Sequence, residues 1–210
     1  MFKDRFDAGY QLAQKLQQYK NNPDAIVLAI PRGALEIGSV LSRELDLPLD
    51  IVLTKKIGYP GNPEYAIGAV SLDNIILDKR VLEFSGALEA YIKQEVAAIR
   101  QLLQERSVAY HGNRAPLSLT DKTVIVTDDG IATGRTLEAT LDLIKKQHPK
   151  KIIVAVPVAS KEALQLIKKK ADEVLCLIIP DFFMSVGQWY QKFDQVDDSQ
   201  AIALLQGSYK

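Results

Sequence analysis

One stretch near the middle of the chain constrains the fold more than any other: residues 123–136, which read T-V-I-V-T-D-D-G-I-A-T-G-R-T. It opens with β-branched residues side by side and no polar alternation, a pattern typical of a strand covered on both faces. A loop of small and hydroxyl residues follows, and then Leu137, Leu141 and Ile144 recur at helical spacing. The stretch therefore predicts a strand, a loop and a helix. In open α/β sheets, ligands bind where such a loop leaves the carboxyl end of a strand.

The loop of this stretch suits a phosphate group. Backbone N–H groups at a helix start can bind an anion, and the helix dipole favours negative charge there. Gly130 and Gly134 let the backbone approach a ligand closely. Thr133 and Thr136 add hydroxyl donors.

Two adjacent acids, Asp128 and Asp129, stand between the strand and the loop. Like charges side by side at a strand end are costly unless something binds them. The vicinal hydroxyls of a ribose ring can donate to both carboxylates. Together with the loop, the acids therefore predict a site for a ribose 5-phosphate. The alternative is that these residues serve only as turn and cap residues.

The run V-I-V-T-D-D-G-I-A-T-G-R-T resembles the phosphoribosyl-pyrophosphate (PRPP) motif of the type I phosphoribosyltransferases. The resemblance implies that the acid pair binds the ribose hydroxyls and that the loop holds the 5-phosphate. It assigns PRPP binding to Asp128, Asp129, Gly130, Ile131, Ala132, Thr133, Gly134, Arg135 and Thr136. Two positions depart from the commonest pattern, in which both are aliphatic: Thr127 at the end of the strand and Gly130 just after the acids. Gly130 should loosen the loop.

A second strand and loop lie earlier in the chain. Residues 25–30, A-I-V-L-A-I, predict a central strand that runs directly into Pro31, Arg32 and Gly33, and a helix follows. The guanidinium fork of Arg32 suits phosphate oxygens. The resemblance implies that Arg32 and Gly33 bind pyrophosphate. The alternative is an arginine that points to solvent beside a turn.

Residues 48–53 predict the next strand, and the glycines and prolines of residues 54–64 predict a loop. The resemblance implies a mobile loop here, which closes over the reacting centre. Lys55 and Lys56 lie at its base, where either could meet pyrophosphate; strand alternation would place only one of them on the site face. The alternative is a solvated edge. Glu64, the only carboxylate of the loop, is a candidate acid or base. These three residues join the acid pair as candidate catalytic residues.

Alternation of strands and helices along the chain predicts an α/β fold, a doubly wound and mostly parallel sheet with helices on both faces. The first helix is expected over residues 4–20 and is expected to bury Phe6, Tyr10, Ala13, Leu16 and Tyr19. The other elements expected are a β-hairpin at the sheet edge over 65–77, a helix over 85–106, a strand over 151–158, a helix from Ser160 to 170, a strand over 174–179 and a helix capped by Ser199. His111, in a predicted loop, receives no role.

The tail from residue 180 is rich in aromatic residues: Phe182, Phe183, Trp189, Tyr190 and Phe193. The resemblance implies a small hood that supplies a nucleobase pocket, and aromatic stacking suits a flat base. The alternatives are a satellite hydrophobic cluster or the surface of a homodimer. The expected organisation is a single domain over residues 1–210, with a core at about 24–180 and a hood at about 181–210 joined by the N-terminal helix.

Composition excludes several other classes. The chain has 26 basic and 26 acidic residues, so no charge excess favours nucleic acid. The apolar runs are too short for a membrane span, the amino end lacks the apolar core of a signal peptide, and Cys176 is the only cysteine. A cytoplasmic protein is expected, with Cys176 buried on a strand.

The implied reaction transfers 5-phosphoribosyl from PRPP to a nitrogenous base and releases pyrophosphate, or runs in reverse. Mg²⁺ would bridge substrate oxygens with few protein ligands. No pattern identifies the base. Two other classes remain: a non-catalytic regulatory protein that binds PRPP or a nucleotide on the same fold, and a dinucleotide-dependent oxidoreductase. The second is disfavoured because no G-x-G-x-x-G follows the first strand.

Overall fold

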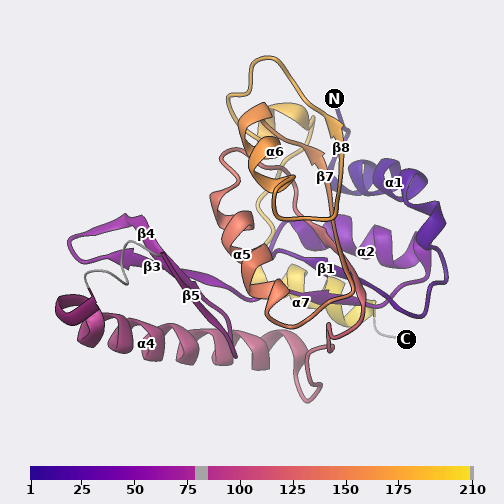
Figure 1. Cartoon of the computed structure of the whole chain (residues 1–210). Coiled ribbons are helices and arrows are strands. Elements are labelled where there is room, and N and C mark those ends of the chain that lie inside the picture. The colour runs from indigo at the N-terminus through magenta and orange to yellow at the C-terminus, as the bar shows by residue number, and fades with distance from the viewer. Residues whose placement is uncertain (79–84, 209–210) are drawn as a thin grey trace.

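A parallel five-stranded sheet forms the centre of the protein (Figure 1), which a computed structural model describes over residues 1–78 and 85–208. The side chains of residues 63, 64 and 85–87 lie outside this description. The strand order is β2-β1-β6-β7-β8, and each neighbouring pair is parallel. The strands are β1 (Ala25–Ala29), β2 (Leu49–Ile51), β6 (Thr123–Thr127), β7 (Lys151–Val158) and β8 (Glu173–Ile178). The expected strands are therefore present, most with shifted ends.

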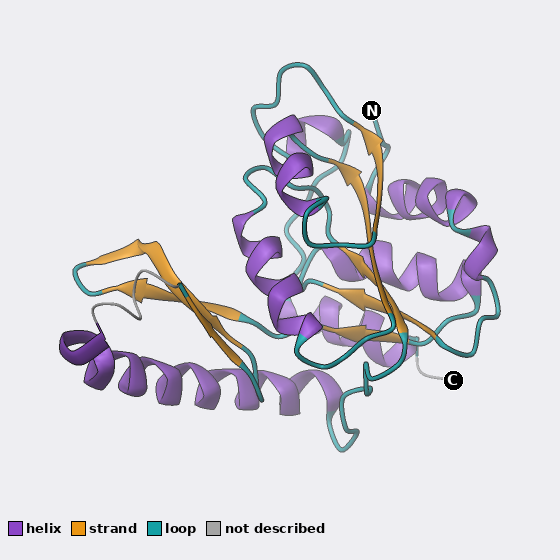
Figure 2. Cartoon of the chain, viewed as in Figure 1, coloured by secondary structure: helices purple, strands orange, loops and turns teal. Residues whose placement is uncertain are grey.

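Helices cover both faces of this sheet (Figure 2). They are α1 (Arg5–Lys15) with the short turn η1 (Gln17–Tyr19), α2 (Ala34–Leu45), α5 (Arg135–Lys145), α6 (Lys161–Ile167) and α7 (Asp198–Gly207). Val27 and Ala29 pack in the layer of α1, α2 and α7, whereas Ile26 and Leu28 pack in the layer of α5 and α6. This alternation is what a strand covered on both faces requires. The doubly wound α/β fold is confirmed.

The strand order reverses between β1 and β6. These two strands are neighbours, with Ala29 opposite Thr127, but α2 follows β1 on one face and α5 follows β6 on the other. The chain therefore leaves these two strands towards opposite faces of the sheet, which is the position at its carboxyl edge where ligands bind in open α/β folds. The loops after β1 and β6 lie at this position.

A second, antiparallel sheet of three strands projects from the core (Figure 1, left). It consists of β3 (Lys55–Tyr59), β4 (Asn62–Val70) and β5 (Ile75–Leu77), and α4 (Ser85–His111) runs along it. The expectation of a loop over residues 54–64 is wrong, because most of this segment forms a hairpin that turns at Pro60 and Gly61. The expectation of a hairpin at the edge of the central sheet is also wrong, because β4 and β5 belong to the projecting sheet.

Burial explains why this segment is ordered as strands. Ile57 and Ile67 are fully buried, and both join the same hydrophobic cluster as α4. The hydroxyl of Tyr91 on α4 donates to the carbonyl oxygen of Gly58 at 3.0 Å. The glycine and proline residues are therefore compatible with a bulged hairpin, whose register shifts on either side of Gly58.

The first helix buries only part of the face expected. Ala13 and Leu16 are buried as expected, but Phe6 and Tyr10 are 37% and 43% exposed. The buried residues of α1 are Arg5, Ala8, Gly9, Leu12 and Ala13. A β carbon at Gly9 would lie 2.9 Å from Val40 Cβ on α2, so small residues let the two helices approach closely. Close helix packing has set the face rather than the larger apolar side chains.

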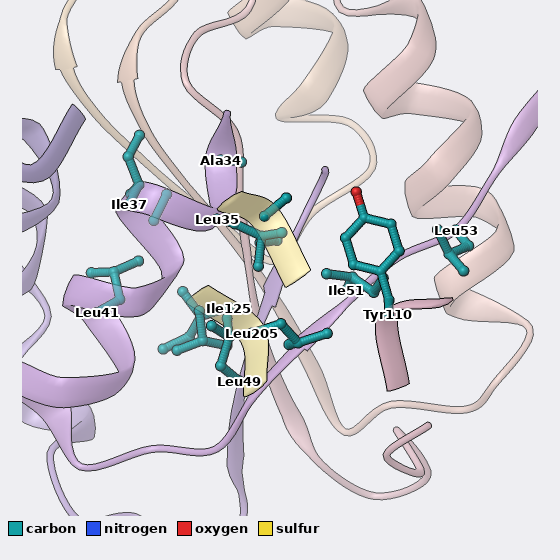
Figure 3. Packing of buried hydrophobic residues seen from close by; sticks show 14 of the residues in the cluster. Ala34, Leu35, Ile37, Leu41, Leu49, Ile51, Leu53, Tyr110, Ile125 and Leu205 are labelled. Carbon is teal, nitrogen blue, oxygen red and sulfur yellow. The ribbon is translucent and has the colours of Figure 1, made fainter. Parts of the chain in front are cut away.

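The last helix starts earlier than expected and belongs to the core. Asp197, not Ser199, caps α7, and the side chains of Asp197 and Gln200 form a capping box. Ala201 and Leu205 lie in the layer of α2, and Figure 3 shows Leu205 beside Leu49 and Ile125. The hood expected over 181–210 therefore excludes α7. Ser160 caps α6 as expected.

Helix α4 is longer than expected and ends at His111, inside the segment expected as a loop. His111 is 5% exposed and hydrogen-bonded to Asp50, so its expected place in a loop is wrong and it has a structural partner. Cys176 lies on β8, as expected, but it is half-buried. Within residues 1–78 and 85–208, no helix combines the length and the apolarity that crossing a membrane needs.

Candidate functional site

The loops after β1 and β6 touch each other at Gly33 and Asp129. A β carbon at Gly33 would lie 2.5 Å from Asp129 Oδ2, closer than real side chains pack. Gly33 is also the residue immediately before α2. Glycine is therefore needed at this position for the two loops to meet, and the structure brings together the acid pair and the P-R-G segment.

Each carboxylate of the acid pair has one oxygen held by the protein. The backbone N–H of Asp129 donates to Asp128 Oδ1 at 2.9 Å, and Arg5 Nε donates to Asp129 Oδ2 at 2.9 Å. The hydroxyl of Tyr190 donates to the Asp129 carbonyl oxygen at 2.6 Å. Among the residues that the structure describes, none donates to Asp128 Oδ2 or Asp129 Oδ1. Two acceptor oxygens, one per acid, are thus available to hydroxyl donors.

The electrostatics of the pair favour such donors. Burial, and then the neighbouring charge of Asp129, raise the pKa of Asp128. Burial also raises the pKa of Asp129, while the Arg5 guanidinium opposes this rise. Two negative charges on half-buried carboxyl groups are not fully balanced by the single nearby cation, Arg5. A ligand that donates hydrogen bonds or carries positive charge would stabilise them.

The loop after the acids is pinned to the end of β7. The N–H of Ile131 donates to Val158 O at 2.9 Å, and Ser160 donates from its N–H to Ile131 O and from Oγ to Ala132 O. Gly134 has φ +74° and directly precedes α5, where no side chain caps the helix. Ala132, Thr133, Arg135 and Thr136 are exposed. The start of α5 is therefore an accessible anion-binding geometry.

The two positions that depart from the commonest motif have structural explanations. Thr127 is fully buried, and its hydroxyl donates to Ala155 O on β7 at 2.8 Å. A β carbon at Gly130 would lie 2.6 Å from Val186 Cγ1 and 3.0 Å from Val158 Cγ1. The loosening expected at Gly130 is therefore not its role: glycine there lets residues 158 and 186 pack against the loop.

Arg32 lies in the loop after β1, and its peptide bond with Pro31 is cis. Its side chain is 51% exposed, and Nη1 lies 3.9 Å from Asp198 Oδ1 at the start of α7. An exposed pair of this kind contributes roughly 0–1 kcal/mol, so an anionic ligand could displace Asp198. Pyrophosphate binding at Arg32 stays a prediction.

The remaining predicted residues lie on the projecting hairpin. Lys55 and Lys56 begin β3, and both are exposed. Thr54 Oγ1 lies 3.0 Å from Thr140 Oγ1, which ties the base of β3 to α5 one turn beyond Thr136. The side chain of Glu64 lies outside the described residues. The catalytic roles of these three residues stay predictions.

The aromatic tail divides into two parts. Phe2, Tyr190 and Phe193 form a cluster in which Tyr190 lies 5.3 Å from Phe2 and 5.0 Å from Phe193, between ring centroids. Residues 2 and 190 also form a β-bridge, so both chain ends build this cover. By contrast, Phe182 and Met184 are each 88% exposed.

Two residues of the site were missed from the sequence, Arg5 and Tyr190. Tyr190 was grouped only with the aromatic tail. Arg5 is the first residue of α1, and Ala8, Gly9 and Leu12 follow it at helical spacing. This stripe of small and apolar residues could have indicated that the face carrying Arg5 packs against another element.

The fold and the site together define a class: doubly wound α/β proteins with an acid pair and an anion-binding loop at the point where the strand order reverses. The chain belongs to the phosphoribosyl transferase domain family, whose family model matches residues 4–193. The family expected from the motif is thereby confirmed.

Individual relatives agree. Over its whole length the chain is 33% identical to a Mycobacterium tuberculosis (strain H37Rv) protein that has the provisional name phosphoribosyl transferase, and it covers 47% of that protein. The chain thus spans about half the length of the curated relatives it matches. The crystal structure of TT1426 from Thermus thermophilus superposes with a TM-score of 0.88 at 36% identity, covering 100% of this chain and 99% of that one. The AQ2163 protein from Aquifex aeolicus shares the fold, with a TM-score of 0.50 at 16% identity over 82% of this chain and 73% of that one.

Proposed function

We propose that this protein transfers the 5-phosphoribosyl group of PRPP to a nitrogenous base and releases pyrophosphate. The observation that carries the proposal is the pair of available carboxylate oxygens, one on Asp128 and one on Asp129, beside an accessible helix start at the carboxyl edge of the sheet. A ribose 5-phosphate offers two vicinal hydroxyls at one end and a phosphate at the other, which matches these two features. Membership of the phosphoribosyl transferase family supports a transferase.

In this proposal the segment from Gly130 to Thr136 holds the 5-phosphate through its backbone N–H groups and threonine hydroxyls. Asp128 and Asp129 accept hydrogen bonds from the two ribose hydroxyls. Arg32, the Gly33 amide and a lysine at 55 or 56 bind the pyrophosphate. These groups come from three separate segments, of which the loops after β1 and β6 already meet at Gly33 and Asp129.

The reaction breaks the bond between ribose C1 and the pyrophosphate oxygen and forms a bond between C1 and a nitrogen of the base. The bonding electrons leave with pyrophosphate, and the base nitrogen loses its proton, for which Glu64 is the candidate acceptor. Positive charge develops on the ribose ring as the first bond breaks. The carboxylates of the acid pair, fixed before reaction, would stabilise that charge.

Mg²⁺ enters this proposal as part of the substrate. Within the described part of the chain, no group of three or more histidine, cysteine, aspartate or glutamate side chains could hold a metal ion. Mg²⁺ usually keeps several waters and binds largely through substrate phosphates. The donor set therefore suits a metal carried on PRPP and pyrophosphate oxygens, where it would neutralise part of their charge.

The base would lie against the segment after β8. Phe182 and Met184 expose their side chains there, and Val186 in the same segment contacts the loop at Gly130. A phenyl ring and a thioether are suited to stacking on a flat heterocycle. The proposed acceptor is accordingly a heteroaromatic base.

Two measurements test the proposal. Calorimetry with PRPP and Mg²⁺ should show binding in the micromolar range, and a screen across purine, pyrimidine and pyridine bases should detect pyrophosphate release with at least one. Absence of PRPP binding would overturn the site. Binding without turnover of any base would overturn the enzyme and favour a regulatory protein that binds PRPP.

A further inference from the structure

Arg5 is a buried arginine beside the acid pair. Its side chain is 6% exposed, and Nε donates to Asp129 Oδ2 at 2.9 Å. Nη1 donates to the carbonyl oxygen of Asp194 at 2.8 Å and lies 3.5 Å from Glu36 Oε2 on α2. A buried guanidinium is tolerated only when it is paired and hydrogen-bonded. These contacts therefore define one position for Arg5.

The flat faces of the guanidinium are also used. Arg5 Cζ lies 3.8 Å from the centroid of the Phe193 ring, and Phe193 stacks on Tyr190, whose hydroxyl donates to Asp129 O. The side chain and the backbone of Asp129 are thus held by the N-terminal and C-terminal segments respectively. A lysine cannot reproduce a planar stack together with two directed donors.

This arrangement fixes the Asp129 side chain but leaves one of its two carboxylate oxygens available. A carboxylate can accept about four hydrogen bonds, and Arg5 uses Oδ2 only, leaving Oδ1 with no donor among the described residues. A β carbon at Gly33 would lie 2.9 Å from Arg5 Nε, so the same ion pair borders the loop after β1. The ion pair therefore lies where the two candidate ligand loops meet.

We propose that Arg5 is a positioning residue for the acid pair: it opposes protonation of the Asp129 carboxylate and orients it so that its remaining oxygen can accept a hydrogen bond from a ligand hydroxyl. The identity of that ligand rests on the proposed function, whereas the effect of Arg5 on the carboxylate does not.

The charged and titratable groups around Asp129 determine the sign of the effect. Asp128 adjoins it, Glu36 on α2 adds negative charge, Asp4 at the start of α1 acts in turn on Glu36, and the phenol of Tyr190 is neutral. Arg5 is the cation that opposes the rise in the pKa of Asp129. Removing it should raise that pKa further, so that Asp129 becomes protonated at a higher pH.

The experiment compares wild type with Arg5→Ala, Arg5→Lys and Phe193→Leu, which removes the ring beneath the guanidinium but keeps the charge. The matched control is Arg43→Ala. Arg43 also pairs with a glutamate, Glu44, and lies 5.4 Å from the Tyr10 ring, but its side chain is 60% exposed and away from the acid pair. Two readouts are needed: ¹³C NMR titration of the aspartate carboxyls, assigned with Asp129→Asn, and calorimetry with PRPP and Mg²⁺ from pH 6 to 9.

We expect the Asp129 carboxyl to titrate at higher pH in Arg5→Ala, with a smaller change in Arg5→Lys and Phe193→Leu and none in Arg43→Ala. PRPP should bind Arg5→Ala about 10-fold more weakly at pH 8, as for loss of one charge-assisted hydrogen bond, and the gap should widen as the pH falls. A folding defect would lower the active fraction without this pH dependence. If Arg5→Ala does not fold, Arg5→Lys and Phe193→Leu still decide the question.

Unchanged carboxyl titration in the Arg5 and Phe193 variants would overturn the inference. Wild type that fails to bind PRPP, with the carboxyl titration still shifted in Arg5→Ala, would overturn the proposed function and support the role of Arg5. PRPP binding in wild type with the same affinity in every Arg5 variant at all pH values would overturn the positioning role alone.

Discussion

His111 Nε2 lies 2.7 Å from Asp50 Oδ1, and the two side chains are only 4% and 3% exposed. The backbone N–H of Leu117 donates to the other carboxylate oxygen, and His111 Nδ1 lies 3.0 Å from Ser107 O. This pair joins the end of α4 to β2, the edge strand of the central sheet. It also borders a cavity of about 300 Å³, lined in addition by Asp46 and Arg114. We interpret the pair as the anchor of the projecting helix.

The anchor should make stability depend on pH. The hydrogen bond to Asp50 raises the pKa of His111 above its ordinary value. A raised pKa in the folded state contributes stability that is full below the unfolded pKa of about 6.5 and is lost as pH rises through the folded pKa. Asp50→Asn should therefore lower the free energy of unfolding by about 3–5 kcal/mol at pH 6 and by less at pH 9. Urea denaturation at both pH values measures this.

The chain supplies its own control, because it has only two histidines. His148 is exposed and has φ +54°, a left-handed conformation that asparagine tolerates, so His148→Asn should leave the unfolding free energy unchanged at both pH values. An equal loss in Asp50→Asn at pH 6 and pH 9 would show that packing, not the charge on His111, explains the effect.

Replacing the acids should weaken ligand binding without changing shape. Asp128→Asn and Asp129→Asn each replace one carboxylate oxygen, an acceptor, with an amide NH2 group, a donor. We expect each to weaken the free energy of PRPP binding, measured by calorimetry, by about 1–3 kcal/mol. Asp142→Asn is the matched control, because Asp142 lies on α5 and pairs with Lys170 away from the loop. If a variant that carries both Asp128→Asn and Asp129→Asn binds PRPP as well as wild type, the ribose site lies elsewhere.

Arg32→Ala should separate pyrophosphate from ribose. If Arg32 binds pyrophosphate, the variant should bind pyrophosphate and PRPP roughly 10-fold or more weakly, whereas ribose 5-phosphate should bind nearly as well as before. Asp198→Asn removes the ion partner of Arg32, so it should leave pyrophosphate affinity unchanged or raise it. Equal losses of affinity for all three ligands would indicate a folding defect. No loss for any ligand would mean that Arg32 points to solvent and has no part in binding.

Gly130→Ala should destabilise the protein by overpacking. The added methyl would lie 2.6 Å from Val186 Cγ1. Inserting an extra carbon into a well-packed site typically lowers the free energy of unfolding by about 1–3 kcal/mol. Gly207→Ala is the control, since a β carbon there meets nothing within 4 Å. Thermal unfolding should show a loss for the first variant only, with recovery in Gly130→Ala/Val186→Ala. A lack of recovery would mean that Val186 is not the obstacle.

The central sheet could be predicted because its signals are local. The apolar run of residues 25–30 and the stretch from Thr123 are each legible within a few residues, and a strand followed by a glycine-rich loop and a helix implies a ligand at the carboxyl edge. The order of acids, glycine and threonines was equally local. The meeting of Gly33 with Asp129 follows from the strand order, which no single stretch contains.

The parts that could not be predicted depend on distant partners. Arg5 and Asp129 are 124 positions apart, so the residues near Arg5 can indicate a packed helix face but cannot identify the partner of its charge. Likewise, the sequence places His111 in a loop, and its burial depends on Asp50, which lies 61 positions away. In residues 54–64, glycine and proline are compatible with either a loop or a bulged hairpin, and the burial of Ile57 under α4 decides between them.

The hairpin of β3 and β4 is the candidate lid, and its tip offers the last test. An enzyme must shield the cation-like transition state from water, since PRPP would otherwise hydrolyse. Tyr59 is 42% exposed and Gly61 has φ +79°, so the turn is open to solvent in this structure. We expect its amides to exchange quickly in the free protein and more slowly when PRPP and a base analogue are both bound.

Deleting Tyr59 to Asn62 should then reduce turnover strongly while PRPP affinity stays within a few-fold, because the deletion leaves the acid pair and its loop intact. Tyr91→Phe is the milder variant: it removes only the hydrogen bond to Gly58 O that holds the hairpin to α4, and it should reduce turnover less. Pyrophosphate release and calorimetry measure the two quantities. A deletion variant with wild-type turnover would exclude the hairpin tip as a lid, and a parallel loss of affinity and turnover would place the hairpin in ligand binding instead.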